Sequence, residues 1–366
     1  MTIKTDMKNK LSLLLFLEVN KERIENIFKI RINGMREIYL PLVSENIIEK
    51  VNKGEDVSSI PVGFFVEGMF YVLGADEEFK FNKLYINILN SVPNSKEYIK
   101  GKIAELVKLN KYEDGYILLK GLSKVEGTEE IYEKLINLLE NLRNTNDEYI
   151  EEEIEIIERA KDIQNFALPY YYEGIIKHEK GDYQGALHSI NAYILAGGKE
   201  TEEILEFKSS LKLISDYKKA KEDVYENPEK ALAVLIPLLS QMGDSAEIYF
   251  HIAIAYRILE NFNKAIYYLE KSMEIDNSFP EAFNELAINY ACLEDFDLAI
   301  KYLRKVFEIT KSIEVCTNLV MCYLNSGDIR QAKIHLEIAK TLDKNDEVVK
   351  ELEQALNEIE EEEVLD

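Results

Sequence analysis

Apolar residues recur at spacings of three and four over most of the chain from about residue 96, and short polar turns interrupt them. Such periodicity is typical of amphipathic helices, which the turns group into pairs. Candidate pairs begin near residues 96, 128, 167, 200, 246, 280 and 313. Their regular recurrence indicates stacked repeats rather than one globular core.

The stretch 246–346 carries the clearest repeat, in three rows that each read as helix, turn and helix. An alanine in the second helix of each row recurs at intervals of 34 and 33 residues and lies 12 residues after a small residue in the first helix. The paired positions are Ala253 with Ala265, Ala287 with Ala299, and Val320 with Ala332. Small side chains on both helices allow the two axes to approach closely, so we expect these positions to face each other.

The same rows share a tyrosine three residues after the small residue of the first helix, and a polar turn that we place at Glu260-Asn261, Glu294-Asp295 and Gly327-Asp328. In these features they resemble the tetratricopeptide repeat. Asn277, Lys311 and Lys344 stand where that family usually has a proline. The resemblance implies an all-α fold, an α-solenoid of stacked helix-turn-helix repeats, which is a general binding scaffold.

The N-terminal region, 1–95, does not show the repeat, and Leu11–Val19 reads as a helix or a strand. Apolar residues alternate over Phe28–Ile32, Asn33-Gly34 follows, and Ile38 and Leu40 come next. This pattern predicts a short β-hairpin that pairs Ile32 with Ile38, and a broken helix pair is the open alternative.

An apolar helix is then predicted from Ser59 and Pro61 to Gly74, which we expect to end it. A second helix covers 80–91. Further on, a long helix is predicted over 201–224, and Pro237 is expected to kink the helix that starts at Pro228.

We divide the chain into four parts. They are the divergent N-terminal region 1–95, degenerate helix pairs over 96–165, tetratricopeptide-like repeats over 166–345, and a capping helix with an acidic tail over 346–366.

The net charge of the chain limits the classes of partner that it is expected to bind. Lys and Arg number 44 against 68 Asp and Glu, a net charge of -24. Such a field repels nucleic acid and anionic membrane surfaces and favours a basic or amphipathic protein or peptide partner. Self-association stays open. The three cysteines, Cys292, Cys316 and Cys322, form no CxxC motif, so we expect buried, reduced thiols and a cytoplasmic protein.

No motif for catalysis, phosphate binding or a metal is present, and the four histidines have no second ligand at metal spacing. We therefore predict no catalytic residue, no metal, no cofactor and no enzymatic activity.

In the family that these rows resemble, the first helix of each pair lines a concave groove. By carry-over this implies a partner-binding groove built from ten residues: Tyr171, Ile175, Phe250, Ile254, Arg257, Asn284, Ile288, Thr317, Met321 and Asn325. The alternative is a groove filled by the chain's own N-terminal region. Phe250, Ile254 and Thr317 stand where a carboxylate-clamping variant of the family needs polar residues, which argues against that variant.

The leading hypothesis is a non-enzymatic scaffold or adaptor that binds a peptide or protein segment in this groove. A peptide-responsive regulatory protein and an accessory subunit of an enzyme complex are the alternatives.

Overall fold

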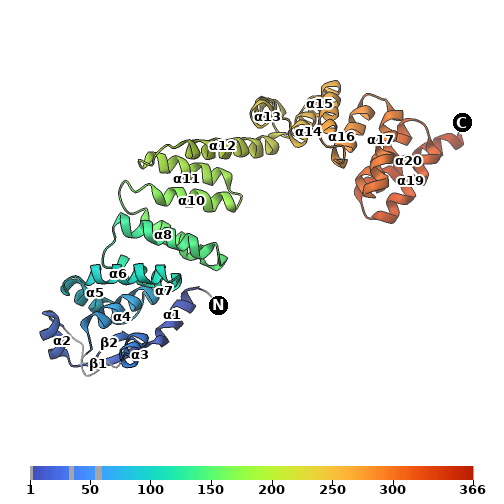
Figure 1. The fold of residues 1–366 in the computed structure, drawn as a ribbon. Coiled ribbons are helices and arrows are strands. Elements are labelled where there is room, and N and C mark those ends of the chain that lie inside the picture. The colour runs from blue at the N-terminus through green and yellow to red at the C-terminus, as the bar shows by residue number, and fades with distance from the viewer. Residues whose placement is uncertain (1–2, 33–36, 54–59, 366) are drawn as a thin grey trace. The chain divides into compact units, whose positions relative to one another are not determined.

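A computed structural model describes residues 3–32, 37–53 and 60–365 of the chain (Figure 1). These residues form two compact units, 1–208 and 209–366, and the boundary falls inside helix α12 (Glu202–Asp223). Within the described residues, no helix combines the length and the apolar character needed to cross a bilayer.

The N-terminal part of unit 1 mixes short helices with two strands. In chain order its elements are α1 (Ile3–Asn9), a 3-10 turn (Lys10–Leu13), β1 (Leu14–Val19), α2 (Lys21–Phe28), β2 (Ile38–Val43), α3 (Ser44–Asn52), α4 (Val62–Ala75) and α5 (Asn82–Ser91). Helix pairs follow it. They are α6 (Ser95–Lys108) with α7 (Tyr112–Ser123), α8 (Glu129–Arg143) with α9 (Ile150–Ala160), and α10 (Leu168–Glu179) with α11 (Tyr183–Leu195). A 3-10 turn (Asp147–Tyr149) precedes α9.

Unit 2 continues the pairs and ends on a single helix. After α12 come α13 (Pro228–Met242), α14 (Ala246–Ile258), α15 (Phe262–Ile275), α16 (Pro280–Cys292), α17 (Phe296–Thr310), α18 (Ile313–Asn325), α19 (Ile329–Leu342) and α20 (Glu347–Leu365). Pro237 lies inside α13.

The small residues in the three rows lie where the spacing predicts. All six positions of the pairs Ala253/Ala265, Ala287/Ala299 and Val320/Ala332 have no exposed surface. One turn further along each pair, two rings meet across the same gap. Tyr256 and Tyr268 stack with centroids 5.5 Å apart, and Tyr290 and Tyr302 stack at 5.8 Å. The close approach of the helices is thus held by a small pair beside a ring pair.

The predicted turns of these rows are confirmed. Glu260, Glu294 and Gly327 each have a positive φ, of 57°, 63° and 80°. The residue after each of them caps the second helix, because its side chain accepts a hydrogen bond from a backbone N–H in the first turn.

The predicted hairpin is wrong in its first strand. Ile38 and Leu40 do lie in a strand, but β2 pairs antiparallel with β1, so that Leu17 faces Leu40 and Val19 faces Ile38. Phe28 instead ends α2, in which Ile24 and Phe28 are both buried at helical spacing. The alternation through Phe28–Ile32 therefore does not come from a strand. The broken helix pair is wrong as well, and Asn33-Gly34 lies outside the described residues.

Gly74 does not end its helix, because α4 continues to Ala75; Ser59, the predicted start, lies outside the described residues. The role of Gly74 is packing against α7. A Cβ built on Gly74 would overlap the backbone oxygen of Ile117, and one built on Gly121 would overlap that of Phe70. Glycine at both positions lets the two backbones touch.

The expectation of three buried thiols is wrong for Cys292, which is exposed, whereas Cys316 and Cys322 are buried and all three are free. Cys292 is the last residue of α16, beyond the buried contact at Ala287.

The core of unit 1 is continuous. One cluster of buried side chains extends from Ile3 in α1 to Ile176 in α10, so the N-terminal region and the first helix pairs share one interior. The buried side chains of unit 2 fall into smaller clusters along its successive pairs.

Candidate functional site

The first helices of the three rows, α14, α16 and α18, contact one another in sequence. They carry a set of exposed or half-buried side chains, which we call the first-helix surface: Glu247, Phe250, Arg257, Glu281, Asn284, Ile288, Glu314, Asn318, Met321 and Asn325. Spacings of three and four within each helix place these side chains along one stripe.

Hydrogen bonds cross this surface from one repeat to the next. The amide of Asn318 donates to the side-chain oxygen of Asn284 over 3.3 Å. The amide of Asn284 in turn donates to the carboxylate of Glu314, also over 3.3 Å. α16 and α18 therefore present one connected polar row.

A buried carboxylate anchors Arg257 at the edge of the surface. The guanidinium of Arg257 pairs with the carboxylate of Glu285, whose side chain is only 9% exposed. Burial raises the pKa of Glu285, while the positive charge of Arg257 opposes that rise. Glu285 thus fixes the orientation of Arg257 between α14 and α16.

The residues predicted for the groove differ in how much of their surface is exposed. Met321 is 38% exposed, and Phe250, Arg257, Asn284 and Ile288 are half-buried. Asn325 is exposed, and its amide donates to the backbone oxygen of Met321 over 2.8 Å.

Ile254 and Thr317 keep 3% and 4% of their surface, so a partner reaches little of either. Phe250 packs edge-on against Phe279, with ring centroids 4.9 Å apart. Tyr171 and Ile175 lie on α10, in unit 1, where the ring of Tyr171 contacts Tyr172 and Tyr193.

Sequence reasoning missed Glu285, Asn318 and the glutamates of the surface. The signal for the glutamates was present, because Glu247, Glu281 and Glu314 recur at intervals of 34 and 33. Glu285 and Asn318 share a repeat position with His251, and this position has no common residue type that would mark it.

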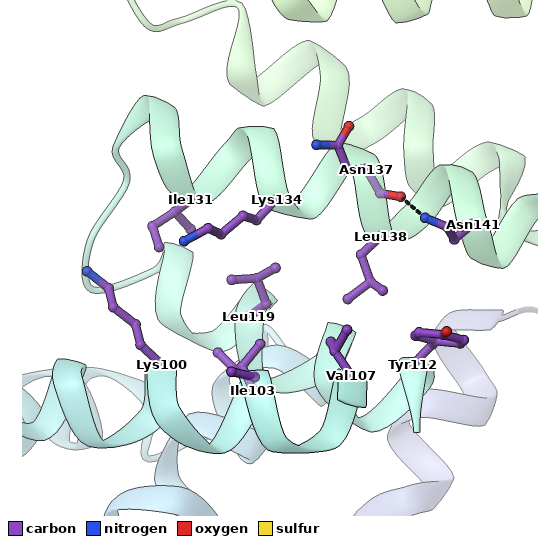
Figure 2. A pocket seen from close by; sticks show the side chains of 11 residues that line it. Lys100, Ile103, Val107, Tyr112, Leu119, Ile131, Lys134, Asn137, Leu138 and Asn141 are labelled. Carbon is purple, nitrogen blue, oxygen red and sulfur yellow. Dashed lines mark hydrogen bonds between the residues drawn. The ribbon is translucent and has the colours of Figure 1, made fainter. Parts of the chain in front are cut away.

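A second candidate site lies in unit 1, between α6, α7 and α8 (Figure 2). It is a pocket of about 470 Å³, lined by Lys100, Ile103, Ala104, Val107, Tyr112, Leu119, Ile131, Lys134, Asn137, Leu138 and Asn141. Aliphatic side chains form its walls. Figure 2 shows the amines of Lys100 and Lys134 at one end and Tyr112 at the other.

Both lysines of this pocket have a carboxylate partner outside its lining. The amine of Lys100 lies 2.9 Å from Glu126, and that of Lys134 lies 2.5 Å from Glu130. Each amine therefore already forms one ion pair.

A buried ion-pair network joins α7 to α9 in the same unit. Lys120 and Glu152 are 3% and 2% exposed and pair with each other, and the hydroxyl of Tyr116 donates to Glu152 over 2.6 Å. Lys120 also lies 3.3 Å from Glu77. Because opposite charges compensate each other here, we interpret the network as structural. In the part of the chain that the structure describes, no three His, Cys, Asp or Glu side chains gather as metal ligands would.

Comparison with known proteins assigns the repeat. The family model of the tetratricopeptide repeat matches residues 246–279 and 313–346, which are α14–α15 and α18–α19. No curated protein matches the chain in sequence.

Solved structures of repeat proteins are similar to parts of the chain. A MamA protein is 19% identical, with 49% of this chain and 92% of MamA covered and a TM-score of 0.36. YrrB, described as a TPR protein with an unusual peptide-binding site, is 16% identical, with 54% and 96% covered and a TM-score of 0.40. The C-terminal part of a TPR repeat-containing protein from Cytophaga hutchinsonii is 16% identical, with 69% and 98% covered and a TM-score of 0.40.

At such scores these structures add no argument about function. The assignment depends on the matched repeats and on the paired helices with their small-residue contacts. Residues 246–279 and 313–346 are tetratricopeptide repeats, and the chain contains repeats of this family.

Proposed function

We propose that this protein is a non-enzymatic scaffold and that its first-helix surface binds a peptide or protein segment. The observation that supports this most is the connected row of Asn318, Asn284 and Glu314 beside the exposed side chain of Met321. Amides supply both donors and acceptors for a peptide backbone, and the apolar side chains beside them supply contact area.

The charge of the surface favours a basic or amphipathic segment. Glu247, Glu281 and Glu314 are all exposed and occupy the same place in successive first helices. The cation of this surface, Arg257, is already paired with Glu285. A partner with lysine or arginine side chains at similar intervals would pair with Glu281 and with Glu247, whose carboxylate already accepts a hydrogen bond from the hydroxyl of Tyr217 over 3.1 Å.

A cytoplasmic location belongs to the same proposal. Free thiols at Cys292, Cys316 and Cys322 are compatible with a reducing compartment.

The test is quantitative co-purification from native cells with the wild type and with the double variant Ile288→Glu, Met321→Glu. The recovered amount of any partner that binds this surface should fall by about tenfold or more. The reason is that burying a carboxylate against an apolar contact costs free energy of binding. The matched control is Ile309→Glu on α17, a second helix, where Ile309 is 72% exposed. Partners retained equally by both variants would exclude the first-helix surface.

A further inference from the structure

The pocket between α6, α7 and α8 differs in charge from the rest of the chain. Its lining contains two lysines and no Asp or Glu, although the whole chain has 68 acidic residues against 44 basic ones. It lies outside the matched repeats, in the other unit from the first-helix surface, and its use does not depend on the function proposed for that surface.

The shape and walls of the pocket fit aliphatic side chains. Its volume of about 470 Å³ lies within the usual range for ligand sites. Ile103, Leu119 and Ile131 are buried at its base, while Val107 is 36% exposed. Aliphatic groups placed here would remove further apolar surface from water.

The two lysine amines of the pocket determine which chemical group of a ligand would lie beside its aliphatic part. Lys100 and Lys134 come from different helices, and their amines lie at one end of the pocket (Figure 2). An ammonium has three donors, so each amine can keep its pair with Glu126 or Glu130 and still bind a further carboxylate. The pair Lys134–Glu130 is largely exposed, at 53% and 62%, which leaves Lys134 free to turn.

The opposite end argues for a peptide rather than a fatty acid. Figure 2 shows Tyr112 and Asn141 toward that end, where the hydroxyl donates to Asn110 and the amide of Asn141 donates to the backbone oxygen of Asn137, each over 2.8 Å. The hydroxyl oxygen of Tyr112 and the amide oxygen of Asn141 can still accept hydrogen bonds. A peptide backbone supplies N–H groups to such acceptors, whereas the methyl end of an acyl chain would cover them without adding a hydrogen bond.

From these observations we infer that the pocket binds a peptide segment with aliphatic side chains followed by a carboxylate side chain. This chain would then bind acidic, aliphatic segments through unit 1, in contrast to the basic segment proposed for unit 2.

The test uses the full chain with labelled isoleucine and leucine methyl groups and a synthetic peptide, acetyl-Leu-Leu-Glu-Glu-amide. The methyl signals of Ile103, Leu119 and Ile131 should shift on titration. Acetyl-Leu-Leu-Gln-Gln-amide should bind about fivefold more weakly, as expected for two exposed charge pairs. Acetyl-Ala-Ala-Glu-Glu-amide should cause no shift.

Variants assign the effect to the pocket. Lys100→Gln with Lys134→Gln should abolish the preference for Glu over Gln, while Lys108→Gln, an exposed lysine of α6 outside the lining, should keep it. Ala104→Trp, at an exposed position in the lining, should fill the pocket and stop binding. Thermal unfolding checks that each variant is folded.

Several results would overturn the inference. They are equal binding of the Glu and Gln peptides, tighter binding of acetyl-Leu-Leu-Lys-Lys-amide, no shift with any peptide, and shifts produced by octanoate alone. Shifts produced by raising the protein concentration without peptide would identify a second copy of this chain as the occupant instead.

Discussion

Single residues in unit 1 carry buried charge that the repeat pattern does not require. Glu153 has no exposed surface, and one of its oxygens lies 2.7 Å from the Nε atom of Arg143. The contact is an ion pair without the alignment of a hydrogen bond, and neither oxygen of Glu153 has a hydrogen-bond partner. Burial therefore raises the pKa of Glu153 to about 7, although Arg143 opposes the rise; Glu140 and Glu179 add to it.

This raised pKa predicts that unit 1 loses stability as the pH rises. In the unfolded chain Glu153 releases its proton near the ordinary value of 4.5, and in the folded chain near 7. Between these values the unfolded state binds fewer protons, so the free energy of unfolding falls, by up to about 3 kcal/mol for this group alone. Hydrogen exchange of α9 at pH 5, 6 and 7 measures the effect.

The variant Glu153→Gln should flatten this pH dependence, because the buried group no longer titrates. Glu158→Gln is the matched control, since Glu158 lies on the same helix with its side chain 58% exposed. Equal pH profiles for wild type and Glu153→Gln would contradict the assignment.

The small residues of unit 2 give a second prediction at this scale. Ala287→Leu should destabilise the α16–α17 pair by about 1–3 kcal/mol, because added atoms at the fully buried contact have no space. Ala291→Leu on the same helix, at a half-buried position, should cost less. Urea unfolding followed by circular dichroism compares the two, and an equal loss would refute the close contact.

At the scale of elements, the contact between α4 and α7 depends on two glycines. Gly74→Ala or Gly121→Ala should destabilise unit 1 by more than about 2 kcal/mol, because each Cβ meets backbone rather than a movable side chain. Gly101→Ala on α6 is the control, since its Cβ would meet no atom within 4 Å. That change should stabilise the helix by about 0.5–1 kcal/mol. Thermal unfolding of the three variants tests both signs.

Elements with a local signal were predictable from the sequence, and those set by distant partners were not. The spacing of Ala265, Ala299 and Ala332 specifies helix pairs because each contact lies within about one repeat. The pairing of β1 with β2 joins residues 19 to 29 positions apart, with α2 between them. The residues of Leu14–Val19 contain no local signal that predicts which strand they pair with. Gly74 resembles a helix end in the sequence, and its packing role becomes clear only because Gly121 lies opposite it.

The candidate site was likewise predictable where its signal is local and unpredictable where it depends on other helices. The stripe along each first helix was predictable, but the burial of Ile254 and Thr317 depends on neighbouring helices. The pocket of unit 1 lies in degenerate pairs, where side chains from α6, α7 and α8 meet without any repeated motif.

At the scale of the whole molecule, the two units are built differently. Unit 1 has one continuous interior, whereas in unit 2 α20 covers the last pair through Val349, Leu352 and Leu356, which are buried with Ala339 and Leu336. Deleting residues 347–366 should therefore destabilise α18 and α19 by several kcal/mol, about 1.5–3 for each buried side chain. Hydrogen exchange should quicken there and stay unchanged in α4 and α7. A uniform change across both units would contradict this division.

The small-residue contacts of unit 2 also bear on how such a chain changes over generations. Each pair from α14 to α19 repeats the same internal contact, and successive pairs share buried side chains, so an in-frame duplication of one 34-residue row would bring similar surfaces to both joints. The interior that extends from Ile3 to Ile176 offers no such joint, because strands and helices far apart in sequence share it. Unit 2 can therefore gain or lose whole repeats under selection, while the N-terminal region has to change by single-residue substitutions.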